Sequence, residues 1–143
     1  MRAAGLRTNA VRGYRAKANI HQQDARHPNR LWRTPLARPN QVWVGNLTSR
    51  RVGTAWRYLA IVMDAYTRCL LAWSLTSRRT AGVTCAVLSR AATRRPVAGV
   101  IFHSDRGSEY MGAPFCAPVR RLGMLQSASV RGVYDIGARS QGR

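Results

Sequence analysis

The chain has 143 residues, of which 24 are lysine or arginine and only five are aspartate or glutamate, giving a formal net charge of +19. That length fits a single domain, and a hydrophobic fraction of 45% can supply a core to which Trp32, Trp43, Trp56 and Trp73 bring large apolar side chains. A surface with this much positive charge attracts polyanions, and nucleic acid is therefore the first partner to consider.

The basic residues are almost all arginine, with Lys17 as the single lysine. Arginine suits bidentate phosphate contacts. A coding bias towards arginine explains the same ratio, but it does not explain why acidic residues are so few.

The cysteines and histidines exclude two common classes of small protein. Cys69, Cys85 and Cys116 are odd in number and widely spaced, so we expect three buried thiols in a reducing compartment and no disulfide framework. His21 and His27 have no cysteine nearby, which argues against a zinc finger. No apolar run approaches the length of a membrane span, and the N-terminus lacks the apolar core of a signal peptide, so we predict a cytoplasmic protein without a membrane partner.

In chain order, residues 1–37 are basic, polar and without periodicity, and prolines such as Pro28 and Pro35 interrupt them. We interpret this region as a cationic arm or linker preceding a domain over 38–143. A disordered tail explains the composition equally well, and either could fold on DNA.

Three strands are predicted next. Residues 42–48 begin the ordered part, 49–54 with Gly53 form a turn, and 56–63 form a second strand rich in aromatic and β-branched residues. After a short connection, residues 69–75 form a third strand. Strands with such short links indicate an antiparallel meander.

The second half alternates helices and strands: a helix over 81–94, a strand over 99–102, a helix over 113–122 and a short strand over 124–127. Thr80 is the expected N-cap of the first helix. One apolar face of that helix is formed by Val83, Val87, Leu88 and Ala91. The resulting order β-β-β-α-β-α-β predicts an α/β fold, with three antiparallel strands followed by parallel crossovers.

One carboxylate stands out in this pattern. The apolar run 100–102 stops at a polar cluster that ends in Arg106 and Gly107. Asp105 is therefore expected just past the end of a buried strand, at the rim of the sheet where α/β proteins bind ligands and metals.

Several motifs now resemble one known family in order and spacing. They are RPNQVWVG at 38–45, YLAIVMD at 58–64, RCLLAW at 68–73, IFHSDRGSEY at 101–110 and RGVYD at 131–135. Over roughly residues 38–135 the chain resembles the catalytic core of the retroviral-integrase-like (DDE) transposases of bacterial insertion sequences. The first seven residues also look like the end of the helix-turn-helix region that precedes this core.

The resemblance implies an RNase H-like fold, a mixed five-stranded sheet flanked by helices. It also implies an Asp-Asp-Glu triad that holds two divalent metals, usually Mg²⁺ and sometimes Mn²⁺, for in-line phosphoryl transfer on DNA. Hard oxygen ligands suit these ions. The implied partner is DNA, and members of the family act as oligomers on DNA ends.

The triad is incomplete in this sequence. The family's second acid falls on Asp105, for which the other interpretation is an aspartate that caps its own turn. The first acid is replaced by Asn46, whose amide oxygen carries no charge. The third falls on Ser140 or Gln141, depending on the motif used for counting, and neither is a carboxylate. We therefore expect the final helix with its glutamate to be missing.

The remaining acids do not replace the lost ligands. Asp64 is expected to be structural, and Glu109 is too close in sequence to Asp105 to stand in for a group from another element. Asp135 comes too early, and Asp24 in the arm is interpreted as a solvated charge.

The resemblance also places Arg106 near phosphate and gives His103 either a structural role or a role in supporting the metal ligands, whereas charge alone suggests Arg50 and Arg51 as DNA contacts. Each of these arginines could equally be a solvated surface charge.

Agreement with the family ends after Asp135, as a frameshift or a decayed gene would produce. We predict a truncated and catalytically inactive transposase core that holds DNA by nonspecific phosphate contacts. The alternatives are an active metal-dependent enzyme and a small basic RNA-binding protein, although no RNA-recognition motif is present.

Overall fold

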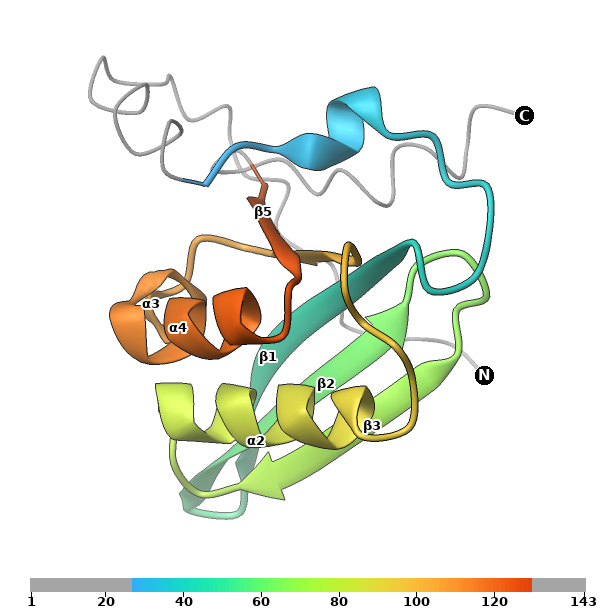
Figure 1. The fold of residues 1–143 in the computed structure, drawn as a ribbon. Helices are drawn as coiled ribbons and strands as arrows, with labels where there is room; N and C mark the ends of the chain where they lie inside the picture. The colour runs from blue at the N-terminus through green and yellow to red at the C-terminus, as the bar shows by residue number, and fades with distance from the viewer. Residues whose placement is uncertain (1–26, 130–143) are drawn as a thin grey trace.

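Five strands form one sheet in the computed structural model, which describes residues 27–129. The strand order across the sheet is β3-β2-β1-β4-β5, and α2, α3 and α4 lie together on one face of it (Figure 1). The strands are β1 (Val42–Val52), β2 (Ala55–Asp64), β3 (Leu70–Thr76), β4 (Ile101–Ser104) and β5 (Leu125–Ala128). The helices are η1 (Arg30–Arg33), α2 (Ala81–Ala92), α3 (Ser108–Met111) and α4 (Ala113–Arg121).

The strand directions follow the predicted meander and crossovers. β1 pairs antiparallel with β2, and β2 pairs antiparallel with β3. β4 pairs parallel with β1 and with β5. The centre of the sheet is thus a parallel pair whose carboxyl ends share one rim, and this confirms the mixed five-stranded α/β fold.

The first hairpin is longer than the sequence predicted. A turn was expected over 49–54, yet β1 continues to Val52 and pairs residue by residue with β2, up to Val52 opposite Ala55. Only two residues remain for the turn, and the first of them, Gly53, has a φ of 61°. Two-residue hairpin turns of this kind require positive φ, which glycine adopts without steric cost.

The main core lies between the sheet and the helices. Its largest fully buried side chains include Trp43, Phe102, Phe115 and Leu88. The rings of Phe102, Tyr110 and Phe115 pack with centroids 5.1 to 6.0 Å apart, a separation typical of favourable aromatic pairs.

The expectation that all four tryptophans supply the core was wrong for three of them. Only Trp43 is buried, whereas Trp32, Trp56 and Trp73 are each more than half exposed. Trp56 lies near the turn of the β1–β2 hairpin, opposite Arg51, and Trp73 lies on β3, which is an edge strand of the sheet.

A second, smaller core cluster corrects the view of residues 27–37 as a plain linker. η1 begins after Asn29, whose side chain accepts a hydrogen bond from the Leu31 backbone N–H at 3.0 Å. Leu31 is buried against Val42, Ala65 and Ile101. One leucine with a local cap is enough to order a short segment, but it is too little for a periodic signal in the sequence.

The helices agree with prediction in the middle and differ at their ends. Thr80 caps α2 as expected, its side chain accepting from the Val83 N–H, and α2 ends at Ala92 rather than at residue 94. The one-turn helix α3 was not predicted. Across residues 27–129 there is no helix with the length and apolarity that crossing a membrane requires.

The prediction of three buried thiols was also wrong in part, because Cys69 is exposed, Cys85 is half-buried and only Cys116 is buried. The expected helix-turn-helix remnant and the missing final helix, with Ser140 and Gln141, lie outside the described residues.

Candidate metal centre and nucleic-acid contacts

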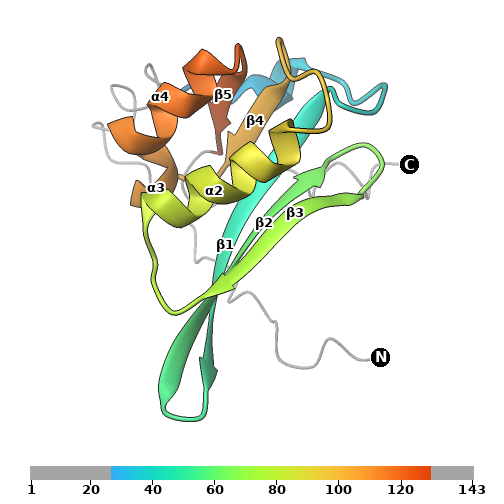
Figure 2. The same ribbon diagram turned by 60° about the horizontal axis from the view of Figure 1, so that its bottom comes forward.

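Asp105 is the first residue after β4, as predicted, and its side chain is exposed. The parallel register of β1 and β4 ends with Val44 opposite His103. β1 and β4 run side by side (Figure 2). Asn46 follows Val44 by two residues on β1, and Asp105 follows His103 by two residues just past the end of β4. The register therefore places both site residues that the sequence proposed near the end of β4, at the centre of the sheet.

The turn after β4 fixes the orientation of Asp105. Its Oδ1 accepts a hydrogen bond from the Gly107 backbone N–H at 2.8 Å, which is the turn-capping role that the sequence left open. A Cβ on Gly107 would stand 2.9 Å from this Oδ1 and 2.5 Å from Oε2 of Glu109. A side chain at position 107 would therefore displace one or both of these carboxylates.

Asn46 is exposed on β1. Its Nδ2 donates to Oγ1 of Thr48 at 3.1 Å, so its amide is held by a neighbour on the same strand. The preceding residue, Gly45, is buried, and a Cβ there would stand 2.3 Å from Cζ of Phe102. The core ring thereby fixes the backbone that carries Asn46.

Glu109 is buried and pairs with Arg79, which precedes α2. Burial raises the pKa of Glu109, but the hydrogen bond from Arg79, a backbone hydrogen bond and the charge of Arg79 outweigh it, so the pKa lies below its ordinary value. The same hydrogen bond raises the pKa of Arg79, with a smaller contribution from the charge of Asp105. No sequence pattern predicted this pair, whose members are 30 residues apart.

The donor set at this rim does not fit the family's metal centre. Asp105 brings one carboxylate and Asn46 a neutral amide, while the carboxylate of Glu109 is held by Arg79. Within the part of the chain that the structure describes, no group of three or more His, Cys, Asp or Glu side chains could hold a metal ion. Replacing a carboxylate by the neutral amide of Asn46 removes a charge that would offset the dehydration of Mg²⁺.

Asp64 and His103 have partners that agree with structural roles. The carboxylate of Asp64 accepts backbone N–H groups from Asn40, Tyr66 and Thr67 at 2.7 to 3.1 Å. Nδ1 of His103 lies 2.9 Å from Oγ of Ser127 on β5. Asp64 ties the start of β1 to the β2–β3 turn, far along the strands from Asn46.

The three arginines proposed to contact DNA lie in two places. Arg50 and Arg51 are exposed on β1, four and five residues beyond Asn46, or about 13–17 Å at the rise of an extended strand. Arg106 lies next to Asp105 and is partly buried, and its Nη2 donates to the carbonyl of His27 at 3.0 Å. Arg106 therefore connects the rim of the sheet to the segment before η1.

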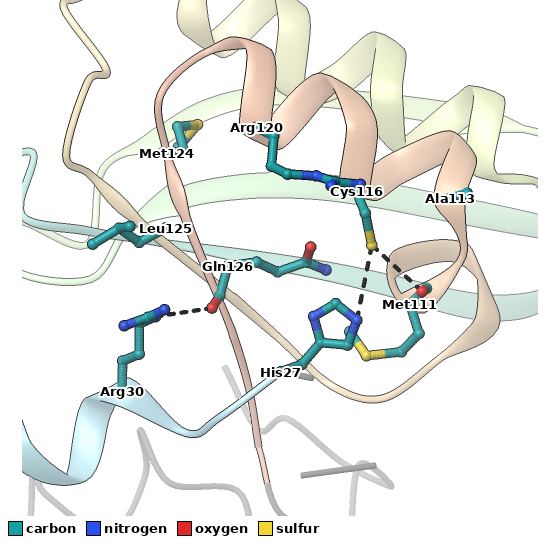
Figure 3. A pocket seen from close by; sticks show the side chains of 9 residues that line it. All are labelled: His27, Arg30, Met111, Ala113, Cys116, Arg120, Met124, Leu125 and Gln126. Carbon is teal, nitrogen blue, oxygen red and sulfur yellow. Dashed lines mark hydrogen bonds between the residues drawn. The ribbon is translucent and has the colours of Figure 1, made fainter. Parts of the chain in front are cut away.

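A cavity of about 510 Å³ lies between this segment, α4 and β5. Figure 3 shows Cys116 of α4 facing His27, with the sulfur 3.9 Å from Nε2, and Arg30 donating to the carbonyl of Gln126. Its other lining residues are Met111, Ala113, Arg120, Met124 and Leu125. Neither Asn46 nor Asp105 lines this cavity.

The mixed sheet has the strand order β3-β2-β1-β4-β5, helices on one face and an acidic residue just past the end of β4. This arrangement defines an RNase H-like fold. Two solved structures have the same fold, each matched over 73% of this chain at 17% identity. They are the simian T-cell lymphotropic virus intasome in complex with a PP2A regulatory subunit, with a TM-score of 0.59 over 40% of that chain, and the HTLV-2 integrase catalytic core in complex with magnesium, with a TM-score of 0.55 over 66% of that chain.

The sequence model of the family described as Integrase core domain matches residues 37–132. The InsF transposase of insertion sequence IS3A from Escherichia coli K12 is 39% identical over 99 residues, which cover 68% of this chain and 34% of the transposase. The chain therefore belongs to the integrase core family. It spans between a third and a half of the length of the InsF transposases that it matches.

Proposed function

We propose that this chain is a transposase-type integrase core that holds DNA through nonspecific phosphate contacts and does not catalyse strand transfer. The observation that carries the proposal is that Asn46, which carries no charge, stands on β1 near the end of β4, where Asp105 follows, whereas the family pattern has a carboxylate at both positions. The charge of +19 and the exposed arginines of β1 support the DNA contacts.

The metal part of the proposal is that Mg²⁺ or Mn²⁺ binds weakly at Asp105. At the dielectric constant of water, a unit negative charge about 4 Å from a divalent ion contributes roughly 2 kcal/mol, or about 30-fold in affinity. An Asn46→Asp variant should therefore bind Mn²⁺ at least about tenfold more tightly than the wild-type chain, as measured by electron paramagnetic resonance of free Mn²⁺.

Ser49→Asp is the matched control for the metal experiment. Ser49 is exposed on the same strand, three residues beyond Asn46 and on the opposite face, so its carboxylate adds the same charge away from Asp105. Equal gains in the two variants would show that general charge, and not a site at Asp105, attracts the ion.

The DNA part is tested by the salt dependence of binding. Each phosphate contact contributes a slope of about 0.9 to the fall of log K with log salt. Arg50→Ala combined with Arg51→Ala should lower the slope by about 2 on a labelled duplex. The control is Arg90→Ala with Arg94→Ala at the end of α2, which removes the same charge from exposed positions. An unchanged slope, or the same loss in the control, would contradict a contact at β1.

A metal-dependent strand-transfer enzyme is the second candidate, favoured by the exposure of Asp105 and by membership of the integrase core family. The family depends on divalent metal and acts on DNA as an oligomer, and we propose that any oligomer of this chain also assembles on DNA. A chain that acts on chromosomal DNA has to reach it, so we propose a cytoplasmic location.

A further inference from the structure

The tip of the β1–β2 hairpin, residues 50–57, carries an arrangement that the proposed DNA contacts alone do not explain. The hairpin extends well past the helices and the rest of the sheet (Figure 2). At its end Trp56 is 53% exposed and Val52 is 60% exposed. A large aromatic side chain on a projecting hairpin is not needed for the core, which α2 and the centre of the sheet complete without it.

The register of the hairpin places cations around this indole. Trp56 pairs directly with Arg51, and Arg50 pairs with Arg57 on the neighbouring rung. Side chains directly opposite each other on paired strands lie on the same face of the sheet. Arg51 therefore stands beside the indole, while Arg50 and Arg57 share the other face.

These cations have no acidic partner on the tip, because residues 50–57 contain three arginines and no aspartate or glutamate. Within the tip, Nη1 of Arg57 donates to the backbone carbonyl of Trp56 at 3.2 Å. Like charges directly opposite each other on paired strands are unfavourable. A polyanion bound at the tip would remove this cost.

We propose that the hairpin tip is a platform for unpaired bases of DNA: Trp56 stacks on one base, and Arg50, Arg51 and Arg57 contact the flanking phosphates. An indole can stack on a base only where a base face is uncovered, and in a duplex the neighbouring bases cover it. Exposed aromatic side chains among cations are the usual means by which proteins hold single strands without reading their sequence. The inference rests on the proposed DNA binding and adds to it a preference for frayed or overhanging ends.

The test uses the full chain and two labelled DNA probes with equal numbers of phosphates, a blunt duplex and a duplex with a single-stranded overhang. Loss of one stacked base weakens binding about tenfold or more. Trp56→Ala should therefore weaken binding of the overhang by about tenfold and leave the blunt duplex nearly unchanged. Trp56→Phe should retain most of the affinity, because phenylalanine also stacks.

Trp73→Ala is the matched control. Trp73 is 54% exposed on β3 and pairs with Ile61, so it lacks an arginine opposite it. Equal losses for the overhang in Trp56→Ala and Trp73→Ala, or equal losses on both probes in Trp56→Ala, would overturn the platform. Binding of anionic phospholipid vesicles that depends on Trp56, with no effect of Trp56 on DNA, would overturn it as well.

The two proposals fail in different ways. If the wild-type chain binds neither probe, the proposed DNA-binding function is wrong and the platform is wrong with it. If the wild-type chain binds both probes with a steep salt dependence and Trp56→Ala changes neither affinity, the phosphate contacts stand and the base platform alone is refuted.

Discussion

The ion pair of Arg79 and Glu109 predicts an asymmetric response to mutation. Glu109 is 5% exposed and Arg79 is 51% exposed. If Glu109 is changed, water can therefore hydrogen-bond to Arg79 in its place, but if Arg79 is changed, water cannot reach Glu109. A hydrogen bond to a charged group contributes about 1.5–3 kcal/mol, and exposure of the arginine reduces this by about half. Arg79→Met should therefore destabilise the chain by about 1–2 kcal/mol, whereas Glu109→Gln should cost less than about 1 kcal/mol.

The pH dependence of this difference has a definite sign. The pKa of Glu109 in the folded chain lies below its ordinary value of 4.5, so the pair stabilises the fold above that value and is lost as the pH falls through the folded pKa. In Arg79→Met the burial and the backbone hydrogen bond of Glu109 remain, and burial, which raises its pKa, is the larger of the two causes. The difference in unfolding free energy between the wild-type chain and Arg79→Met should thus be largest at neutral pH. It should shrink as the pH falls and the carboxyl group of Glu109 becomes protonated.

Urea unfolding followed by circular dichroism measures both effects. With a slope of about 1–3 kcal/mol per molar urea, the midpoint of Arg79→Met should fall by about 0.5–1 M at neutral pH and approach that of the wild-type chain in acid. The reasoning is refuted if Glu109→Gln costs as much as Arg79→Met, or if the gap between Arg79→Met and the wild-type chain stays constant down to about pH 3.

Three further substitutions test the packing around the site, each by urea unfolding. Gly45→Ala places a Cβ 2.3 Å from Cζ of Phe102 and should cost about 1–3 kcal/mol; a neutral effect would contradict the close packing under Asn46. Asp64→Ala leaves three backbone N–H groups without their acceptor and should cost about 2–4 kcal/mol. A loss under about 1 kcal/mol would contradict a structural role for Asp64. Thr80→Ala removes the α2 cap and should cost about 1 kcal/mol, while Thr80→Ser should restore most of it.

The parts of the fold that the sequence predicted well have strong local signals. α2 combines a capping threonine with an apolar face at helical spacing, and Val87, Leu88 and Ala91 are buried as expected. The position of Asp105 followed from a short apolar run that ended in turn residues. The mixed five-stranded sheet followed from the resemblance, but the strand order across it was not predicted, because local patterns do not specify which strands are neighbours.

The parts that were missed depend on distant contacts or on exposed strands. The end of β1 lacks the alternation of apolar and polar residues that marks a strand, because both faces of the hairpin are open to solvent there. This is why Ser49, Arg50 and Arg51 were assigned to a turn. The ion pair of Glu109 with Arg79 joins a residue before α2 to a residue of α3, which follows β4 in the chain. No local sequence pattern predicts such a distant contact. The exposure of Trp56 and Trp73 likewise depends on how far the helices reach across the sheet.

The central claim is that the rim formed by Asn46 and Asp105 no longer supports metal-dependent chemistry on DNA. The most direct measurement is a cleavage and strand-transfer assay on labelled DNA with Mg²⁺ or Mn²⁺, comparing the wild-type chain with Asp105→Ala. We predict that the wild-type chain forms no metal-dependent product above the level of Asp105→Ala. A robust product that requires the metal and disappears in Asp105→Ala would contradict the account.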